Sequence, residues 1–217
     1  MNESRENEMK LSEILKPLRD KIDEDDKIRE SALPLARNAV RKCSEAIKLV
    51  HREQFDEARS QIVEASKIIE QTESEISVSD FLSKSKSLDV AYQELAEASN
   101  LLSLVEKGEF TPPEEFSIPV QAYLTGLADT VGELRRASLD LLRNDDLEGA
   151  ESFLAFMEEI LEELQTFDYP NALIPDLRRK CDVARGIVER TRADLTRAVG
   201  QSRLMAKLDG FESKLKD

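Results

Sequence analysis

Four acidic residues stand out because of their positions on two segments of helical character. Glu94 and Glu97 lie three positions apart on the first segment, and Asp129 and Glu133 lie four apart on the second. Residues at these separations share one face of an α-helix. Each pair therefore presents two carboxylates on the same side of its helix. Clustered carboxylate oxygens are the ligands that hard divalent ions such as Mg²⁺ or Mn²⁺ prefer.

The segment that carries Glu94 and Glu97 is apolar on nearly all sides. Its main stripe comprises Leu88, Ala91, Tyr92, Leu95 and Leu102. Apolar residues also stand on the opposite face beside the two glutamates, namely Val90, Leu101, Leu104 and Val105. A helix that is apolar all round is expected inside the protein, packed against several neighbours.

The segment that carries Asp129 and Glu133 has an apolar stripe and, on its other face, small residues. The stripe comprises Val120, Tyr123, Leu124, Leu127, Val131 and Leu134. The second face holds Ala122, Gly126 and Ala137 beside the two acids. Because glycine weakens a helix interior, Gly126 and Gly132 indicate the close approach of another helix or a ligand.

Two explanations of these acids are open on spacing alone. A buried carboxylate without compensation takes up a proton or binds a cation, which favours a metal site. The chain also has 45 acidic residues, so same-face pairs arise without function and are then solvated or paired with lysine. Glu158 and Glu162 form such a pair without apolar neighbours, and we expect both to be solvated.

At these residues the sequence resembles the translin family. The stretches that carry the resemblance are Tyr92-Gln-Glu-Leu-Ala-Glu-Ala98 and Pro119-Val-Gln-Ala-Tyr-Leu-Thr-Gly-Leu-Ala-Asp-Thr-Val-Gly-Glu-Leu134. They are more similar to translin-associated factor X, which has QExxEA and Pro-Val-x-Tyr-Leu-x-Gly-x-Ala-Asp-x-x-Gly-Glu-Leu patterns, than to translin. A weaker resemblance extends from about residue 32 to 199 and includes Leu49-Val-His-Arg52.

The resemblance implies a helical fold, a hollow oligomer that is usually an octamer, and single-stranded nucleic acid bound inside it. It also implies a Mg²⁺-dependent endoribonuclease, because the factor X subunit has this activity while translin lacks the acids. The family's catalytic and metal-binding acids fall on Glu94, Glu97 and Asp129, with Glu133 as a further metal ligand. Since this chain has all four, the resemblance favours a catalytic form that works as a homo-oligomer.

A basic stripe precedes these segments on an acidic protein. Its members lie within about 100° of one helix circumference: Arg37, Arg41, Lys48, His51 and Arg52. Positive charge along one line suits phosphate binding, so we expect these residues to contact RNA. Aromatic residues make up only 5% of the chain, which favours recognition of the nucleic-acid backbone over base stacking. A second basic group, Arg178, Arg179 and Lys180, alternates with acids farther along and is expected to form surface ion pairs.

Composition excludes several classes of protein. The 217 residues are 40% hydrophobic and 35% charged, with seven Gly, seven Pro and no Trp, which suits long helices better than a β-sandwich. The net charge of −14 disfavours non-specific binding to nucleic acid or an anionic membrane. No apolar run is long enough to span a bilayer. Cys43 and Cys181 have no metal-ligand spacing, so we expect a reducing, cytoplasmic setting.

The hydrophobic periodicity predicts one all-α, translin-like domain over residues 1–217, a bundle of six or seven helices. Prolines 17 and 34 are expected to kink or break the first helix, and the tail after Gly200 to be a short amphipathic piece at most. The predicted helices run from about Met9 to Arg52, Phe55 to Ile76, the 77–87 region to Glu106, Ile118 to Arg143, Leu147 to Phe167 and Asp176 to Val199.

Together these features predict a metal-dependent endoribonuclease that binds single-stranded RNA, with single-stranded DNA as a second ligand, and forms a homo-octamer. Two alternatives remain: a translin-like protein that binds nucleic acid without cleaving it, and an acidic helical scaffold with no nucleic-acid role.

Overall fold

Six α-helices and one short 3₁₀ helix form the part of the chain that the structure describes. The computed structural model covers residues 10–216, with the side chains of all but 210 and 212–216, so residues 1–9 and 217 of the predicted domain lie outside it. The elements are α1 (Leu11–Val50), α2 (Phe55–Ile76), α3 (Asp89–Lys107), η1 (Pro113–Phe116), α4 (Val120–Arg143), α5 (Leu147–Gln165) and α6 (Leu177–Lys216). No strand occurs within residues 10–216, so the predicted all-α class is confirmed.

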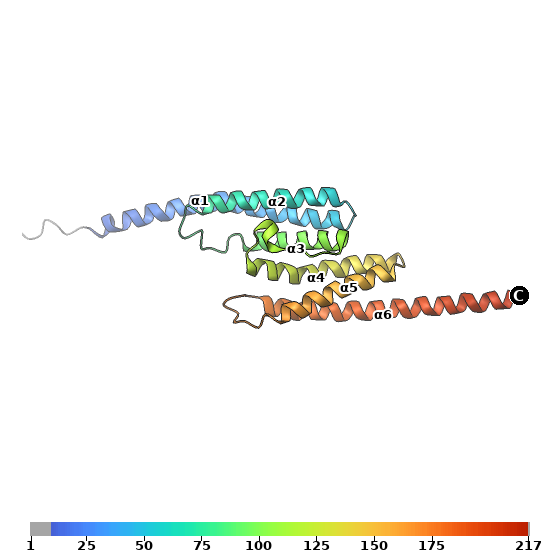
Figure 1. Cartoon of the computed structure of the whole chain (residues 1–217). Coiled ribbons are helices and arrows are strands. Elements are labelled where there is room, and N and C mark those ends of the chain that lie inside the picture. Colours follow the sequence, from blue (N-terminus) through green and yellow to red (C-terminus); the bar gives the residue numbers. More distant parts are fainter. Residues whose placement is uncertain (1–9, 217) are drawn as a thin grey trace, which may run out of the picture.

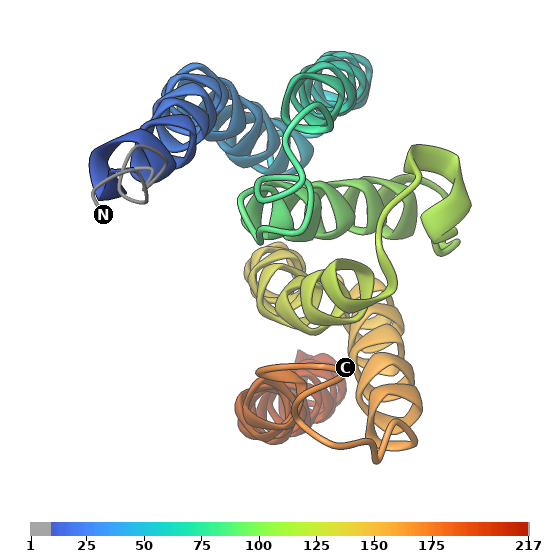
Figure 2. The same ribbon diagram turned by 90° about the vertical axis from the view of Figure 1, so that its left-hand side faces the viewer.

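The helices pack in layers with α3 and α4 at the centre. Helices α1 and α2 form a neighbouring pair, α3 lies against both of them and against α4, and α5 and α6 cover the far side of α4 (Figures 1 and 2). The apolar residues of α3 explain this position, because Leu95, Leu101 and Leu104 are all fully or almost fully buried. The prediction that 88–106 forms an inner helix is therefore confirmed.

Gly126 allows α3 and α4 to approach closely. A Cβ atom at this position would lie 2.4 Å from the backbone oxygen of Gln93 and 2.7 Å from Cβ of Ala96. At Gly132 an added Cβ would meet no atom of this chain within 4 Å, so the expected approach of another helix does not occur there within the chain. The contact at Gly126 fixes the spacing of the two helices that carry the acidic residues.

Gly126→Ala should therefore destabilise the fold, by about 1–3 kcal/mol, because the added methyl group forces α3 and α4 apart. Gly132→Ala is the matched control and should raise stability by up to about 1 kcal/mol through helix propensity alone. Thermal unfolding of the two variants beside the wild type measures both effects. Equal stability of the two variants would contradict the close packing.

Three features differ from the sequence-based expectations. Helix α1 continues through Pro17 and Pro34, so a break at either proline is wrong. A proline removes one helical hydrogen bond, and the remaining bonds continue the helix on both sides. Helix α6 extends to Lys216 instead of ending near Val199. Val120, placed in the core stripe, is 69% exposed because it is the first residue of α4.

Helices α1 and α6 extend beyond the bundle at opposite ends of the molecule (Figure 1). In the first part of α1 and at residues 201–209 of α6, the side chains are mostly exposed. None of the helices described is long and apolar enough to cross a membrane.

Candidate metal centre and nucleic-acid interface

The structure brings the four acidic residues together between α3 and α4. Glu94 and Glu97 on α3 are partly buried, and the side chains of Asp129 and Glu133 on α4 are 30% and 27% exposed. The negative charges of Glu94, Asp129 and Glu133 all raise the pKa of Glu97, so these carboxyl groups lie near enough to interact. We call these four residues the acidic cluster.

Asp129 is held by a lysine from a distant part of the chain. Lys180 Nζ, on the first turn of α6, donates hydrogen bonds to both carboxylate oxygens of Asp129, at 2.6 Å and 2.5 Å. The side-chain amide of Gln93, on α3, donates a third bond to Oδ2 at 2.9 Å. The lysine side chain is only 15% exposed, so this ion pair is largely shielded from water. An ammonium group thus occupies the oxygens that a metal ion would use.

Glu133 has a different partner, His51, at the C-terminal end of α1. The His51 Nε2 and Glu133 Oε2 atoms are 2.6 Å apart, and the imidazole side chain is 5% exposed. Arg136 lies 3.8 Å from the same oxygen. The hydrogen bond from His51, with the positive charges nearby, lowers the pKa of Glu133 below its usual value despite partial burial. Glu133 is therefore more readily ionised than Glu94 or Glu97.

Glu94 and Glu97 behave in the opposite way. Burial, followed by the charges of Glu94, Asp129 and Glu133, raises the pKa of Glu97 to about 8. Burial and the neighbouring charge of Asp129 also raise the pKa of Glu94, although Lys180 offsets part of this effect. Cys43, buried on α1, has its pKa raised to about 12 by burial and by the two glutamates. Negative charge is therefore unfavourable on the α3 side of the cluster, where a carboxyl group takes up a proton or needs a cation to remain ionised.

The donor set fits a divalent ion in chemistry, because four carboxylates supply hard oxygen ligands. In the positions that the side chains adopt, however, no group of three or more His, Cys, Asp and Glu residues within the described chain is arranged to hold a metal ion. The Lys180–Asp129 and His51–Glu133 contacts account for this arrangement, since each turns one carboxylate toward a nitrogen. A metal ion here requires rotation of Asp129 away from Lys180.

The predicted basic stripe is divided between two environments. Arg37, Arg41 and Lys48 are exposed on α1, and Arg52 is exposed in the turn that follows it. His51 instead lies in the acidic cluster, so its side chain is not part of that exposed surface. Arg37 and Arg41 line a groove between α1 and α3, with Val40 and Val90 among its apolar walls. This groove offers two guanidinium groups to an anionic ligand.

Sequence reasoning missed two residues at this site. Gln93 belongs to the motif that carries Glu94 and Glu97, but its role as a donor to Asp129 follows only from the packing of α3 on α4. Lys180 was assigned to a group of surface ion pairs with Arg178 and Arg179, and both arginines do form exposed pairs, with Asp168 and Asp176. The hydrophobic stripe of α6 could have shown that Lys180, unlike these arginines, lies beside the buried face of the helix. Leu177 and Cys181, on each side of Lys180, are both buried.

Comparison with known proteins agrees with this architecture. The sequence pattern of the Translin family matches residues 5–192. An uncharacterised protein of Methanocaldococcus jannaschii is 33% identical over 185 residues, which cover 84% of this chain and 82% of that protein.

Solved structures extend the match to three dimensions. The crystal structure of AfC3PO is 33% identical, with a TM-score of 0.80 over 88% of this chain and 99% of that one. The AfC3PO–duplex RNA complex is also 33% identical, with a TM-score of 0.79 over 88% and 98% of the two chains. Apo-NeC3PO has a TM-score of 0.77 over 88% and 100%, but at 19% identity it shows the fold alone. Because the family pattern spans most of the sequence and its helical arrangement matches, this chain belongs to the translin family.

Proposed function

We propose that the protein binds RNA and hydrolyses its phosphodiester bonds at the acidic cluster, where Glu94, Glu97, Asp129 and Glu133 would hold Mg²⁺ or Mn²⁺. The observation that carries this proposal is that four carboxylates on two facing helices lie near enough to influence one another, with the pKa of Glu94 and Glu97 raised by burial and by their neighbours. Such a cluster has unsatisfied affinity for a cation. The possession of all four acids also favours the factor X branch of the family over translin.

The side chains of the cluster have distinct tasks in this reaction. A divalent ion bound there would lower the pKa of a water molecule and neutralise charge that develops on the phosphate. Glu133, kept ionised by His51, would bind the ion through its charge, and Asp129 would become a ligand once it rotates away from Lys180. A carboxylate that is not committed to the metal ion would serve as general base, and the pKa of about 8 that Glu97 has without a bound cation suits a group that accepts a proton near neutral pH.

The RNA-binding part of the proposal has separate support. AfC3PO, at 33% identity, has been solved in complex with duplex RNA. In this chain, Arg37 and Arg41 on α1 and Arg52 just after it are exposed and available to phosphates, and Lys48 is exposed beside Glu45. We further propose that the protein works as a hollow homo-octamer that encloses its RNA, with single-stranded RNA as the preferred substrate and single-stranded DNA as a weaker ligand.

A cleavage assay tests the proposal directly. Labelled single-stranded and duplex RNAs are incubated with the full chain in Mg²⁺, in Mn²⁺ or in chelator. We expect endonucleolytic products with either ion, more from the single strand, and none in chelator. Cleavage that persists in chelator would contradict a metal-dependent site.

Salt dependence tests the basic surface independently of cleavage. Arg37→Ala combined with Arg41→Ala should weaken RNA binding and reduce the slope of log affinity against log salt by about 0.7 for each phosphate that the variant no longer binds. Arg143→Ala, an exposed arginine at the end of α4, is the matched control and should leave the slope unchanged. Fluorescence anisotropy at four salt concentrations measures both. An unaltered slope in the double variant would mean that RNA does not contact Arg37 and Arg41.

One observation favours a second candidate, RNA binding without catalysis. Lys180 already neutralises Asp129, and no three potential ligands within residues 10–216 are arranged around one point. A cluster held permanently in this state would be structural. RNA binding without cleavage in any divalent ion would support this candidate.

A further inference from the structure

Helix α1 carries a seam of small and apolar residues that is interrupted by Asp25 and Arg29. Only part of this seam is covered by the rest of the chain. Within the bundle, residues at alternating steps of three and four are buried: Ala32, Ala36, Ala39, Cys43, Ala46 and Val50. The same alternation continues toward the N-terminus through Arg29 and Asp25 to Ile22, Leu18, Leu15 and Leu11. This spacing is the a/d pattern of a two-helix coiled coil. We call residues 11–31 the α1 arm.

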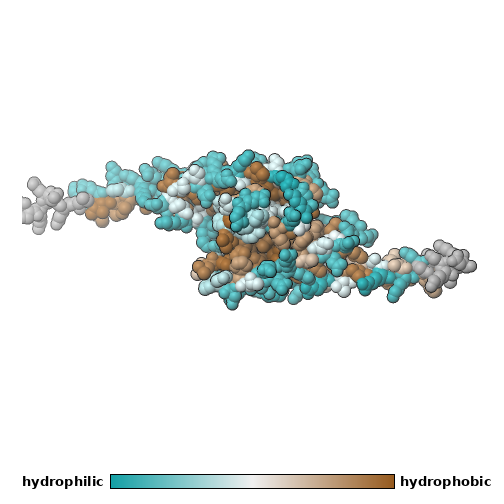
Figure 3. All heavy atoms as spheres, in the orientation of Figure 1, coloured by the Kyte–Doolittle hydropathy of each residue, from teal (hydrophilic) through white to brown (hydrophobic). Residues whose placement is uncertain are grey.

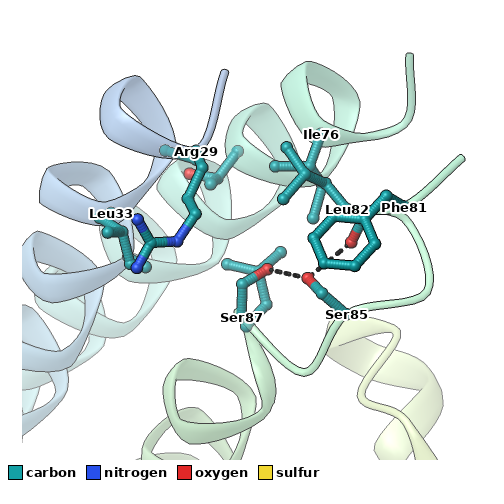
Figure 4. Close-up of a pocket in the computed structure, with 11 residues that line it drawn as sticks. Arg29, Leu33, Ile76, Phe81, Leu82, Ser85 and Ser87 are labelled. Atoms are coloured by element: carbon teal, nitrogen blue, oxygen red, sulfur yellow. Dashed lines mark hydrogen bonds between the residues drawn. The ribbon is translucent and has the colours of Figure 1, made fainter. Parts of the chain in front are cut away.

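The seam becomes uncovered where α2 ends. At this point an apolar cavity of about 300 Å³ lies between α1, the end of α2 and the loop that follows it. Arg29 and Leu33 from α1 stand on one side of the cavity, and Ile76, Phe81 and Leu82 on the other (Figure 4). Beyond it Leu11, Leu15, Leu18 and Ile22 are 67%, 43%, 56% and 66% exposed. These side chains form an apolar strip on the protruding part of α1 (Figure 3).

Helix α6 ends in a second arm of the same design. Residues 200–216, the α6 arm, lie beyond the segment that the family pattern matches, which ends at residue 192. Leu204, Leu208 and Phe211 follow steps of four and three and are exposed, and Leu215 continues the spacing in the sequence. The stripe from 204 to 215 has the same length, twelve residues, as the stripe from 11 to 22.

Neither arm is expected to be a stable helix on its own. Helices of this length are marginal in water, and most of their stability in proteins comes from packing of an apolar face. The α1 arm contains Pro17, and the α6 arm contains Gly200 and Gly210, which weaken a helix interior. Within one molecule the arms cannot support each other, because they project from opposite ends (Figure 1).

We propose that the α6 arm of one copy of this chain packs along the α1 arm of a second copy, so that the two apolar stripes cover each other. The α1 arm has seven acidic and five basic residues, and the α6 arm has four basic and two acidic residues, so their net charges are opposite. Pairing of either arm with itself brings like net charges together. In a parallel self-pair of the α1 arm, Asp25 and Arg29 would each face their own copy at the seam. The contact between different arms avoids both penalties.

Cross-linking of the full chain tests this contact. Two differently tagged chains are co-expressed, one with Leu18→Cys and the other with Leu208→Cys, and are oxidised under mild conditions. The natural cysteines, Cys43 and Cys181, are buried and free, so the introduced thiols are the reactive ones. We expect the mixed 18–208 product in excess over both homotypic products. Predominance of 18–18 or 208–208 products would overturn the proposal.

Two controls make the result specific. In the first control, Glu162→Cys, at an exposed position of α5, is used in place of Leu18→Cys and then in place of Leu208→Cys. The amount of cross-linked product in these pairs is the yield expected from random collision. Leu204→Asp, added to the Leu208→Cys chain, places a charge in the stripe and should reduce the mixed product to that level. Circular dichroism shows whether the bundle remains folded. A mixed product no greater than the collision control, or one unaffected by Leu204→Asp in a folded protein, would also overturn the contact.

Discussion

Glu97→Gln should reduce RNA cleavage by at least about 100-fold while leaving RNA binding unchanged. Loss of a residue that only hydrogen-bonds to a metal ligand commonly costs roughly 10–100-fold, so loss of a ligand or general base should cost at least the upper figure. Glutamine has nearly the same shape as glutamate, and Glu97 is partly buried, whereas the arginines of α1 that are proposed to contact RNA are exposed. Initial rates on a labelled RNA, with binding measured in chelator, separate the two effects.

A matched control distinguishes loss of function from general loss of charge. Glu162→Gln removes one acid from an exposed position of α5 and should cleave at the wild-type rate. If Glu97→Gln also cleaves normally, the acidic cluster is not the catalytic site. If wild type and both variants fail to cleave but bind RNA, the non-catalytic alternative is correct.

The dependence of stability on pH provides a second check on Glu97. A carboxyl group whose pKa is raised to about 8 in the folded protein, from 4.5, makes folding less favourable as the pH rises between these values. Wild-type stability should therefore decline from about pH 4.5 to 8 through this group, and Glu97→Gln should lack that part of the decline. Divalent ions should reduce the same decline in the wild type. If the free energy of unfolding changes with pH in the same way for both proteins, the pKa of Glu97 is not raised by burial.

Lys180→Met should destabilise the protein without divalent ions, by about 1–3 kcal/mol, and should enlarge the stabilisation that Mg²⁺ provides. Removal of one partner from a shielded ion pair leaves the other charge uncompensated, here Asp129 beside Glu94 and Glu97. The same substitution removes the ammonium group that competes with a metal ion for the Asp129 oxygens. The melting temperature measured over a Mg²⁺ titration reports both consequences without reference to activity.

The double variant Lys180→Met/Asp129→Asn is the control for this prediction. With both charges removed, stability should return most of the way to the wild-type value, because no buried charge is left alone. Mg²⁺ should then stabilise it less than it stabilises Lys180→Met. If Lys180→Met shows a smaller response to Mg²⁺ than the wild type, Lys180 helps to build the metal site and does not compete for it.

The sequence predicted most of the helices because their apolar spacing leaves little choice. The bounds of α2, predicted as Phe55 to Ile76, agree with the structure, and the C-terminal end of α3 and both ends of α4 and α5 differ by at most two residues. The start of α3, which the sequence left open over residues 77–87, lies at Asp89. The two errors arose from local rules that ignore the rest of the helix. Pro17 and Pro34 were expected to kink or break α1, and the chain after Gly200 was expected to be a short amphipathic piece at most, beyond the end of the last helix.

The candidate site was predictable only in part, for a physical reason. Spacing placed each pair of acids on one face, and motif resemblance joined the two pairs. Which residues meet them from other helices depends on rotation and crossing of α1 and α6, which no local pattern specifies. Lys180 and His51 were therefore both assigned to basic surfaces, although each reaches an acid of α4 from a distant part of the chain.

The His51–Glu133 contact gives the protein a built-in spectroscopic probe. The chain has one histidine and no tryptophan, so each copy contributes a single imidazole to the aromatic region of a proton NMR spectrum and no indole. That imidazole touches the acidic cluster at 2.6 Å. Its ring-proton resonances should therefore move when a cation enters the cluster, in unlabelled wild-type protein, and relaxation-optimised spectra of one signal per copy would show whether all copies in an assembly fill alike.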